Sequence, residues 1–230
     1  MNAAIIDLAG LPARHLNAKL HALPPDTRET YWRVLNPRGQ HALAAGVNAP
    51  LRIEIAGHAG YYCAGMNARA TVVIEGNAGN GVAENMMSGH VQVRGDASAA
   101  AGATAHGGLL VIGGNAAARC GISLKGADIV VGGNVGHMSA FMAQAGTLTI
   151  LGDAGENLGD SLYEAEIFVG GNVASLGSDC IEKPLRAEDV AGIAERLRLA
   201  GFEGVNPAQF RRYGSARALY HFHPDNAGAY

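Results

Sequence analysis

The side chains with the greatest capacity for chemistry in this 230-residue chain are its three cysteines and nine histidines. Thiolates and imidazoles ligate zinc, and clustered thiolates hold iron–sulfur centres. Cys63, Cys120 and Cys180 are far apart in the sequence, and no Cys-x-x-Cys pair occurs. We therefore expect buried structural thiols and no metal or cluster site in this chain.

The histidines show no ligand pattern either. Four of them fall at different positions of the repeat described below: His58, His90, His106 and His137. A metal site on stacked repeats would need its ligands in one column or in adjacent columns. His221 and His223 are the only close pair, and we expect them to pack in the C-terminal tail. We predict no catalytic, cofactor-binding or metal-binding residue.

A Gly followed by a polar residue recurs every 19 residues along the chain. Gly57 and Gly76 are 76 − 57 = 19 positions apart, and every later step as far as Gly171 has the same length. Asn and Asp tolerate left-handed backbone and bond to nearby backbone groups. We predict a structural ladder that bonds from coil to coil at one corner, with an ion-binding ladder as the alternative. Its members are His58, Asn77, Asp96, Asn115, Asn134, Asp153 and Asn172.

Two columns of aliphatic residues precede each Gly, and they predict the strands that hold the ladder in place. Two residues before each Gly stand Ile55, Ile74, Val93, Ile112, Val131, Ile150 and Val169. Four residues before it stand Ile53, Val72, Val91, Leu110, Ile129, Leu148 and Ile167. A spacing of two places both columns on one face of a strand, and a fixed period near 20 is typical of a solenoid. The sequence predicts an all-β, single-stranded parallel β-helix of seven 19-residue coils.

The flanks interrupt the period and give three predicted regions. Residues 1–45 form an N-terminal arm or cap, residues 46–183 the β-helix, and residues 184–230 a C-terminal helix and tail. Pro12 to Leu20 and Glu188 to Ala200 are the expected helices, and the second of these should cap the rod. Its apolar face is expected to carry Val190, Ile193, Ala194 and Leu197, with Gly201 just beyond its end.

Small columns separate the strands and indicate turns. Two residues after each Gly stand Ala59, Ala78, Ala97, Ala116, Val135, Ala154 and Val173. The outward column three residues before each Gly includes four apolar members, Val73, Val111, Val130 and Phe168. An isolated rod would expose them, and exposed apolar stripes mark contacts. We predict that they form an interface, covered by a terminal arm or by a partner subunit.

Composition excludes several classes of protein. The net charge is −3, which argues against nucleic acid and anionic membranes as partners. The sequence has no apolar run long enough for a transmembrane helix. Met1 to Asp7 lacks a basic segment and a long apolar core, so we expect no signal peptide and a cytoplasmic protein.

The in-register Gly-Asn-Ala-Gly and Gly-Asn-Val-Gly corners resemble the C-terminal Gly-x-Gly-x-Gly domain of glutamate synthase, a right-handed β-helix, over about residues 45–180. The chain lacks a Cys after Met1, a flavin barrel and cysteine clusters, so it resembles a free-standing version of that domain. Arg186 to Ala200 and Tyr213 to Phe222 resemble the tail of glx-type proteins, the middle subunits of N-methylglutamate synthases.

This resemblance implies a non-catalytic scaffold in a hetero-oligomer. The partners would be an amidotransferase-like subunit and a synthase-like subunit that binds FMN and an iron–sulfur cluster. Their product would be N-methylglutamate, made from glutamate and methylamine with release of ammonia. Three alternatives stay open: the β-helical scaffold of formylmethanofuran dehydrogenase, a stand-alone structural or binding protein, and a hexapeptide-repeat enzyme. The period of 19 disfavours the last, because it is not a multiple of six.

Overall fold

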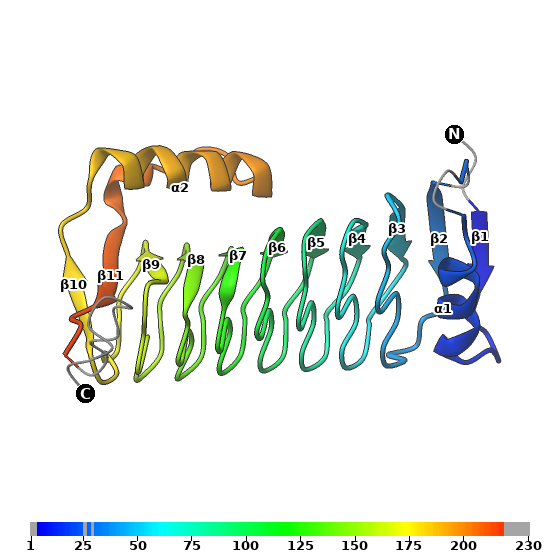
Figure 1. Cartoon of the computed structure of the whole chain (residues 1–230), viewed down its shortest axis with the longest axis horizontal. Helices are drawn as coiled ribbons and strands as arrows, with labels where there is room; N and C mark the ends of the chain where they lie inside the picture. The colour runs from blue at the N-terminus through cyan, green and yellow to red at the C-terminus, as the bar shows by residue number, and fades with distance from the viewer. Residues whose placement is uncertain (1–3, 25–26, 29, 219–230) are drawn as a thin grey trace, which may run out of the picture.

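The computed structural model describes residues 4–24, 27–28 and 30–218 and shows a parallel β-solenoid (Figure 1). The described strands form one sheet in the order β1-β2-β3-β4-β5-β6-β7-β8-β9-β11-β10. They are β1 (Ala4–Asp7), β2 (Tyr31–Leu35), β3 (Arg52–Ile55), β4 (Thr71–Ile74), β5 (His90–Val93), β6 (Leu109–Ile112), β7 (Lys125–Val131), β8 (Ala145–Ile150), β9 (Glu166–Val169), β10 (Cys180–Lys183) and β11 (Arg211–Ser215). All pairs from β1 to β9 are parallel.

The register of the sheet follows the 19-residue period. Ile53 pairs with Val72, and Val72 with Val91, so each aliphatic column runs along the shaft from coil to coil. Every member of the two predicted inward columns is buried in one continuous core. β-Branched side chains stack well on such a pleated surface. The predicted parallel β-helix is therefore confirmed.

The small columns have two roles in the coil. Ala59, Ala78 and the corresponding residues up to Val173 form a second line of parallel bridges, where the pattern predicted turns. Seven residues after each Gly the backbone is left-handed in most coils, for example at Ala83 (φ 56°) and Gly102 (φ 66°). A β-carbon on Gly102 would lie 2.6 Å from Ile129 Cδ1, so this corner needs both left-handed backbone and a minimal side chain.

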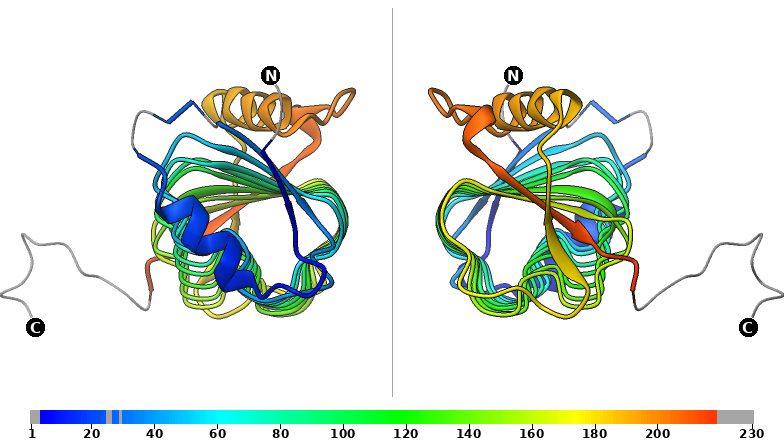
Figure 2. Two further views of the ribbon diagram at one scale, coloured as in Figure 1. Left: turned by 90° about the vertical axis from the view of Figure 1, so that its right-hand side faces the viewer. Right: turned by 90° about the vertical axis from the view of Figure 1, so that its left-hand side faces the viewer.

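The N-terminal region extends the rod as well as ending it. Strands β1 and β2 add two parallel rungs before the first full repeat, and helix α1 (Ala13–His21) lies between them in the chain. Its buried residues Leu16 and Leu20 join the same core as Val34. In Figure 2, α1 lies against the wall of the coil at this end of the rod. The helix predicted from Pro12 is confirmed.

The C-terminal helix does not cap the rod, and this prediction was wrong. Helix α2 (Ala187–Ala200) runs along the outer face of the sheet (Figure 1). At this end the sheet continues instead through β11, which pairs antiparallel with both β9 and β10, so β10 is the last strand. An amphipathic pattern specifies that a face must be buried, but it does not specify the surface that buries it.

The buried face of α2 is also rotated from the one expected. Its buried residues are Asp189, Ile193, Leu197 and Ala200, whereas Ala194 is exposed. Gly201 ends the helix with φ 79°, the left-handed conformation predicted for this position. No helix among the described residues is long and apolar enough to span a lipid bilayer.

Candidate functional site

The predicted corner ladder exists as a chain of side-chain-to-backbone hydrogen bonds. Each side chain accepts a hydrogen bond from the backbone N–H of the next member along the rod. The acceptor–nitrogen distances, beginning with His58 Nδ1 to Asn77 N and ending with Asp153 Oδ1 to Asn172 N, are 2.9, 3.0, 2.7, 2.8, 2.7 and 2.6 Å. The ladder therefore uses these polar groups to join successive coils.

The same geometry explains the Gly before each ladder residue from Asn77 onward. A β-carbon on Gly114 would lie 2.3 Å from Asp96 Oδ1, and one on Gly95 would lie 2.1 Å from Asn77 Oδ1. The side chain of one coil thus occupies the space that the next coil leaves free. Sequence reasoning identified the column but not this steric cause.

The predicted outward interface is covered by the chain itself over three of its four members. Val111, Val130 and Phe168 form a second hydrophobic cluster with residues of α2, including Ile193 and Leu197. Val73, on β4, is buried but lies outside this cluster. The sequence left open whether a terminal arm or a partner subunit covers this column. The structure shows that the C-terminal arm, through α2, covers these three residues.

An ionic network around the buried Asp189 joins the N-terminal end of α2 to the sheet. Asp189, 4% exposed, accepts hydrogen bonds from Arg186 Nε and Nη2 at 2.8 and 2.6 Å, and Arg212 Nε lies 3.5 Å away. Glu166 on β9 pairs with both arginines. The hydrogen bond from Arg186 is the main cause that lowers the pKa of Asp189.

Along the helix, the Arg196 guanidinium lies 5.1 Å from the centre of the Phe168 ring, and its Nε donates to Thr149 Oγ1 at 3.3 Å. Burial lowers the pKa of Arg196. These contacts combine cation–π attraction with a hydrogen bond on the otherwise apolar helix–sheet surface. Sequence reasoning missed both polar contacts, because they join residues far apart in the chain.

The cysteines are unsuited to chemistry. All three thiols are buried, and burial raises the pKa of Cys63, Cys120 and Cys180 to about 12. A thiol is nucleophilic or metal-binding only as the thiolate. Among the described residues, no group of three or more His, Cys, Asp or Glu side chains could hold a metal ion. The cysteine positions do not fit an iron–sulfur cluster.

The histidines are also dispersed. His58 begins the corner ladder, and the His41 ring stacks on Tyr61 with centroids 4.5 Å apart. Burial, followed by the charge of Arg52, lowers the pKa of His90, and its Nε2 is buried without a hydrogen-bond partner among the described residues. His221 and His223 lie outside the described residues.

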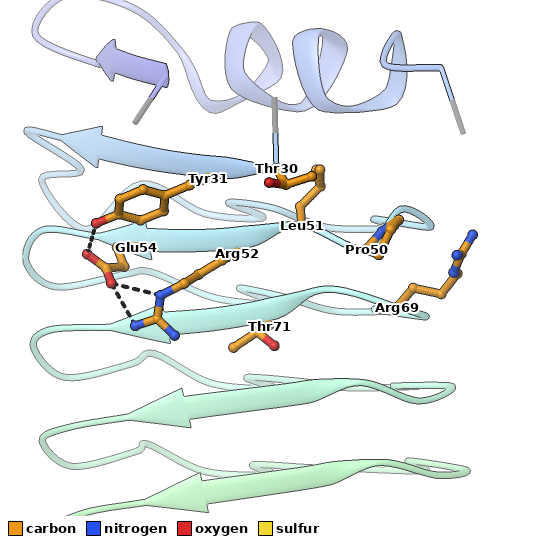
Figure 3. Close-up of a pocket in the computed structure, with 8 residues that line it drawn as sticks. All are labelled: Thr30, Tyr31, Pro50, Leu51, Arg52, Glu54, Arg69 and Thr71. Atoms are coloured by element: carbon orange, nitrogen blue, oxygen red, sulfur yellow. Dashed lines mark hydrogen bonds and ion pairs between the residues drawn. The ribbon is translucent and has the colours of Figure 1, made fainter. Parts of the chain in front are cut away.

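A depression of about 640 Å³, lined by both charged and apolar residues, lies on the outer face of the sheet, over β2, β3 and the start of β4 (Figure 3). Arg52 Nε and Nη2 donate to Glu54 Oε1 at 3.0 and 2.7 Å, and Tyr31 Oη donates to Glu54 Oε2 at 2.6 Å. The hydrogen bond from Tyr31 is the main cause that lowers the pKa of Glu54. Arg69 and Thr71 also line the depression.

The sheet face is thus divided along the rod. Figure 1 shows α2 over the part of the sheet that leads toward β9, and no described helix over β3–β5. The uncovered part holds the depression and Val73, whereas the covered part holds Val111, Val130 and Phe168 of the apolar column. Sequence reasoning did not predict this division.

None of the protein-family models matches the chain, so the Gly-x-Gly-x-Gly resemblance stays a prediction. The chain is 58% identical to Protein GlxC of Rhizobium meliloti (strain 1021) over 226 residues, which cover 98% of this chain and 99% of that protein. Such identity over nearly the full length of both proteins shows a common family. This chain belongs to the family of Protein GlxC.

Proposed function

We propose that this chain is the non-catalytic scaffold subunit of a glutamate-synthase-like complex, an N-methylglutamate synthase. The complex would convert glutamate and methylamine to N-methylglutamate and ammonia. The observation that carries the proposal is the shaft: its interior is filled by stacked aliphatic side chains from Ile53 to Val169, and a hydrogen-bonded ladder joins its coils. Such a rod is suited to holding two partner subunits at a fixed distance.

The chemistry of the side chains supports the scaffold role. The cysteine thiols are buried with raised pKa values, His58 accepts a hydrogen bond in the corner ladder, and His41 stacks on Tyr61. The FMN and iron–sulfur cluster implied by the resemblance are assigned to a partner subunit, since the three cysteines of this chain are dispersed. The match to Protein GlxC covers 99% of that protein, so the same folded unit accounts for nearly the whole of this relative.

Purification of the tagged chain from its native host tests the proposal. We expect a yellow complex with two further chains, a flavin absorption spectrum and N-methylglutamate synthesis from glutamate and methylamine. If the tagged chain purifies alone and colourless, the proposal that it is a subunit of a flavin-containing complex is refuted. A complex that contains tungsten or molybdenum would support the formylmethanofuran dehydrogenase alternative instead.

A further inference from the structure

We infer that the outer sheet face around Arg52 and Arg69 docks an acidic segment of a partner subunit. The inference rests on the proposed function, because it requires a partner. The charge of the surface is its first basis. Among the described residues of this face, Arg33 and Arg52 pair with one carboxylate, that of Glu54, and Arg69 is a third cation. These four groups sum to 3 − 1 = +2, although the whole chain carries −3.

The arginine side chains of this surface remain partly exposed to solvent beside Glu54. The Arg33 side chain is 44% exposed and that of Arg52 is 50% exposed, although both pair with Glu54. Arg69 has no ion-pair partner among the described residues, and Figure 3 shows it at the other side of Thr71 from Arg52. Arginine N–H groups in a fixed fork match carboxylate oxygens well. A segment with two or more carboxylates fits this arrangement.

The same sheet already docks a helix by similar means. The Asp189 carboxylate of α2 pairs with Arg186 at the start of the helix and with Arg212 on β11, next to the apolar contacts of the helix. The uncovered face over β3–β5 continues this surface toward the N-terminal end (Figure 1). Val73 there is already buried, so a partner at this place would bind chiefly through charge. Such contacts mainly set orientation and association rate, and salt weakens them.

The test uses the tagged chain co-expressed with the amidotransferase-like and FMN-binding chains of its host. In the double variant Arg52→Glu with Arg69→Glu, we expect at least a tenfold loss of one partner chain per tagged chain. The matched control Arg119→Glu changes an exposed arginine on another part of the coil and should retain both partners. Salt at about 0.5 M should weaken the wild-type complex in the same direction.

A photo-reactive p-benzoylphenylalanine in place of Thr71 then identifies the occupant. The inference expects a cross-link to an Asp- or Glu-rich peptide of a partner chain. It is overturned by a cross-link to a second copy of this chain or to its own acidic residues Asp26 and Glu29, which lie outside the described residues. It is also overturned if the double variant retains both partners, although the proposed function then survives. A wild-type chain that binds neither partner refutes both.

Discussion

Replacing Gly114 with Ala tests the steric basis of the corner ladder. The added β-carbon would lie 2.3 Å from Asp96 Oδ1 and 3.1 Å from the carbonyl carbon and oxygen of Gly95. The two coils must therefore move apart, or the carboxylate must leave the ladder and lose its 2.7 Å hydrogen bond from Asn115 N.

Two contributions set the expected loss of unfolding free energy in Gly114→Ala. The hydrogen bond is exposed to water, so its loss costs about 1 kcal/mol. Extra volume at a close backbone contact costs about 1–3 kcal/mol. We expect the free energy of unfolding to fall by about 2–4 kcal/mol in total, which lowers Tm by about 4–16 °C for a chain of this size.

Thermal and urea unfolding of the purified variants, followed by circular dichroism, measure this effect. Gly192→Ala is the matched control, because a β-carbon at this helical position would meet only the end of the flexible Arg196 side chain, at 3.3 Å. Alanine in a helix is favoured over glycine by about 0.5–1 kcal/mol, so the Tm of this control should rise. Asp96→Ala in the Gly114→Ala background should restore part of the loss. A Tm for Gly114→Ala equal to that of the wild type would refute the reasoning.

Three other changes probe the helix surface and the core. Val130→Asp buries a carboxylate beneath α2, so it should destabilise the protein by about 3 kcal/mol or more and accelerate amide hydrogen exchange in α2; unchanged exchange would contradict the packing. Asp189→Asn should cost about 3 kcal/mol at neutral pH. Because the folded pKa of Asp189 is lowered, its contribution is present above the unfolded pKa of about 4 and is lost as pH falls through the folded value. The variant should therefore be less sensitive to acid in unfolding titrations, and equal sensitivity would count against the network. Cys63, Cys120 and Cys180 should resist a thiol reagent at pH 8 until the protein is unfolded, and fast labelling in the folded state would show that they are accessible.

The interior of the fold was predictable because its determinants repeat. The columns that contain Ile74 and Val72 specify strand, face and register together, since each coil places the same residue type above the last. The ladder was predictable for the same reason, and its bonds at Asn115 and Asn134 agree with the pattern.

The parts outside the repeat were less predictable. The amphipathic pattern identified α2, but the surface that receives it depends on the network of Asp189 with Arg212, which joins residues far apart in the sequence. The depression at Arg52 and Arg69 depends on how the turn before β4 directs a side chain, and no periodic signal marks it. Glu166 lies two residues before Phe168 on the outward face, and this placement was a hint of ion pairing beside the apolar column.

Reconstitution with and without this chain tests the scaffold role most directly. The purified amidotransferase-like and FMN-binding subunits would be assayed for N-methylglutamate formation, alone and after addition of this chain. We expect synthesis only when all three are present, and no turnover by this chain by itself. Equal synthesis in its absence, or turnover by the isolated chain, would contradict the proposed role.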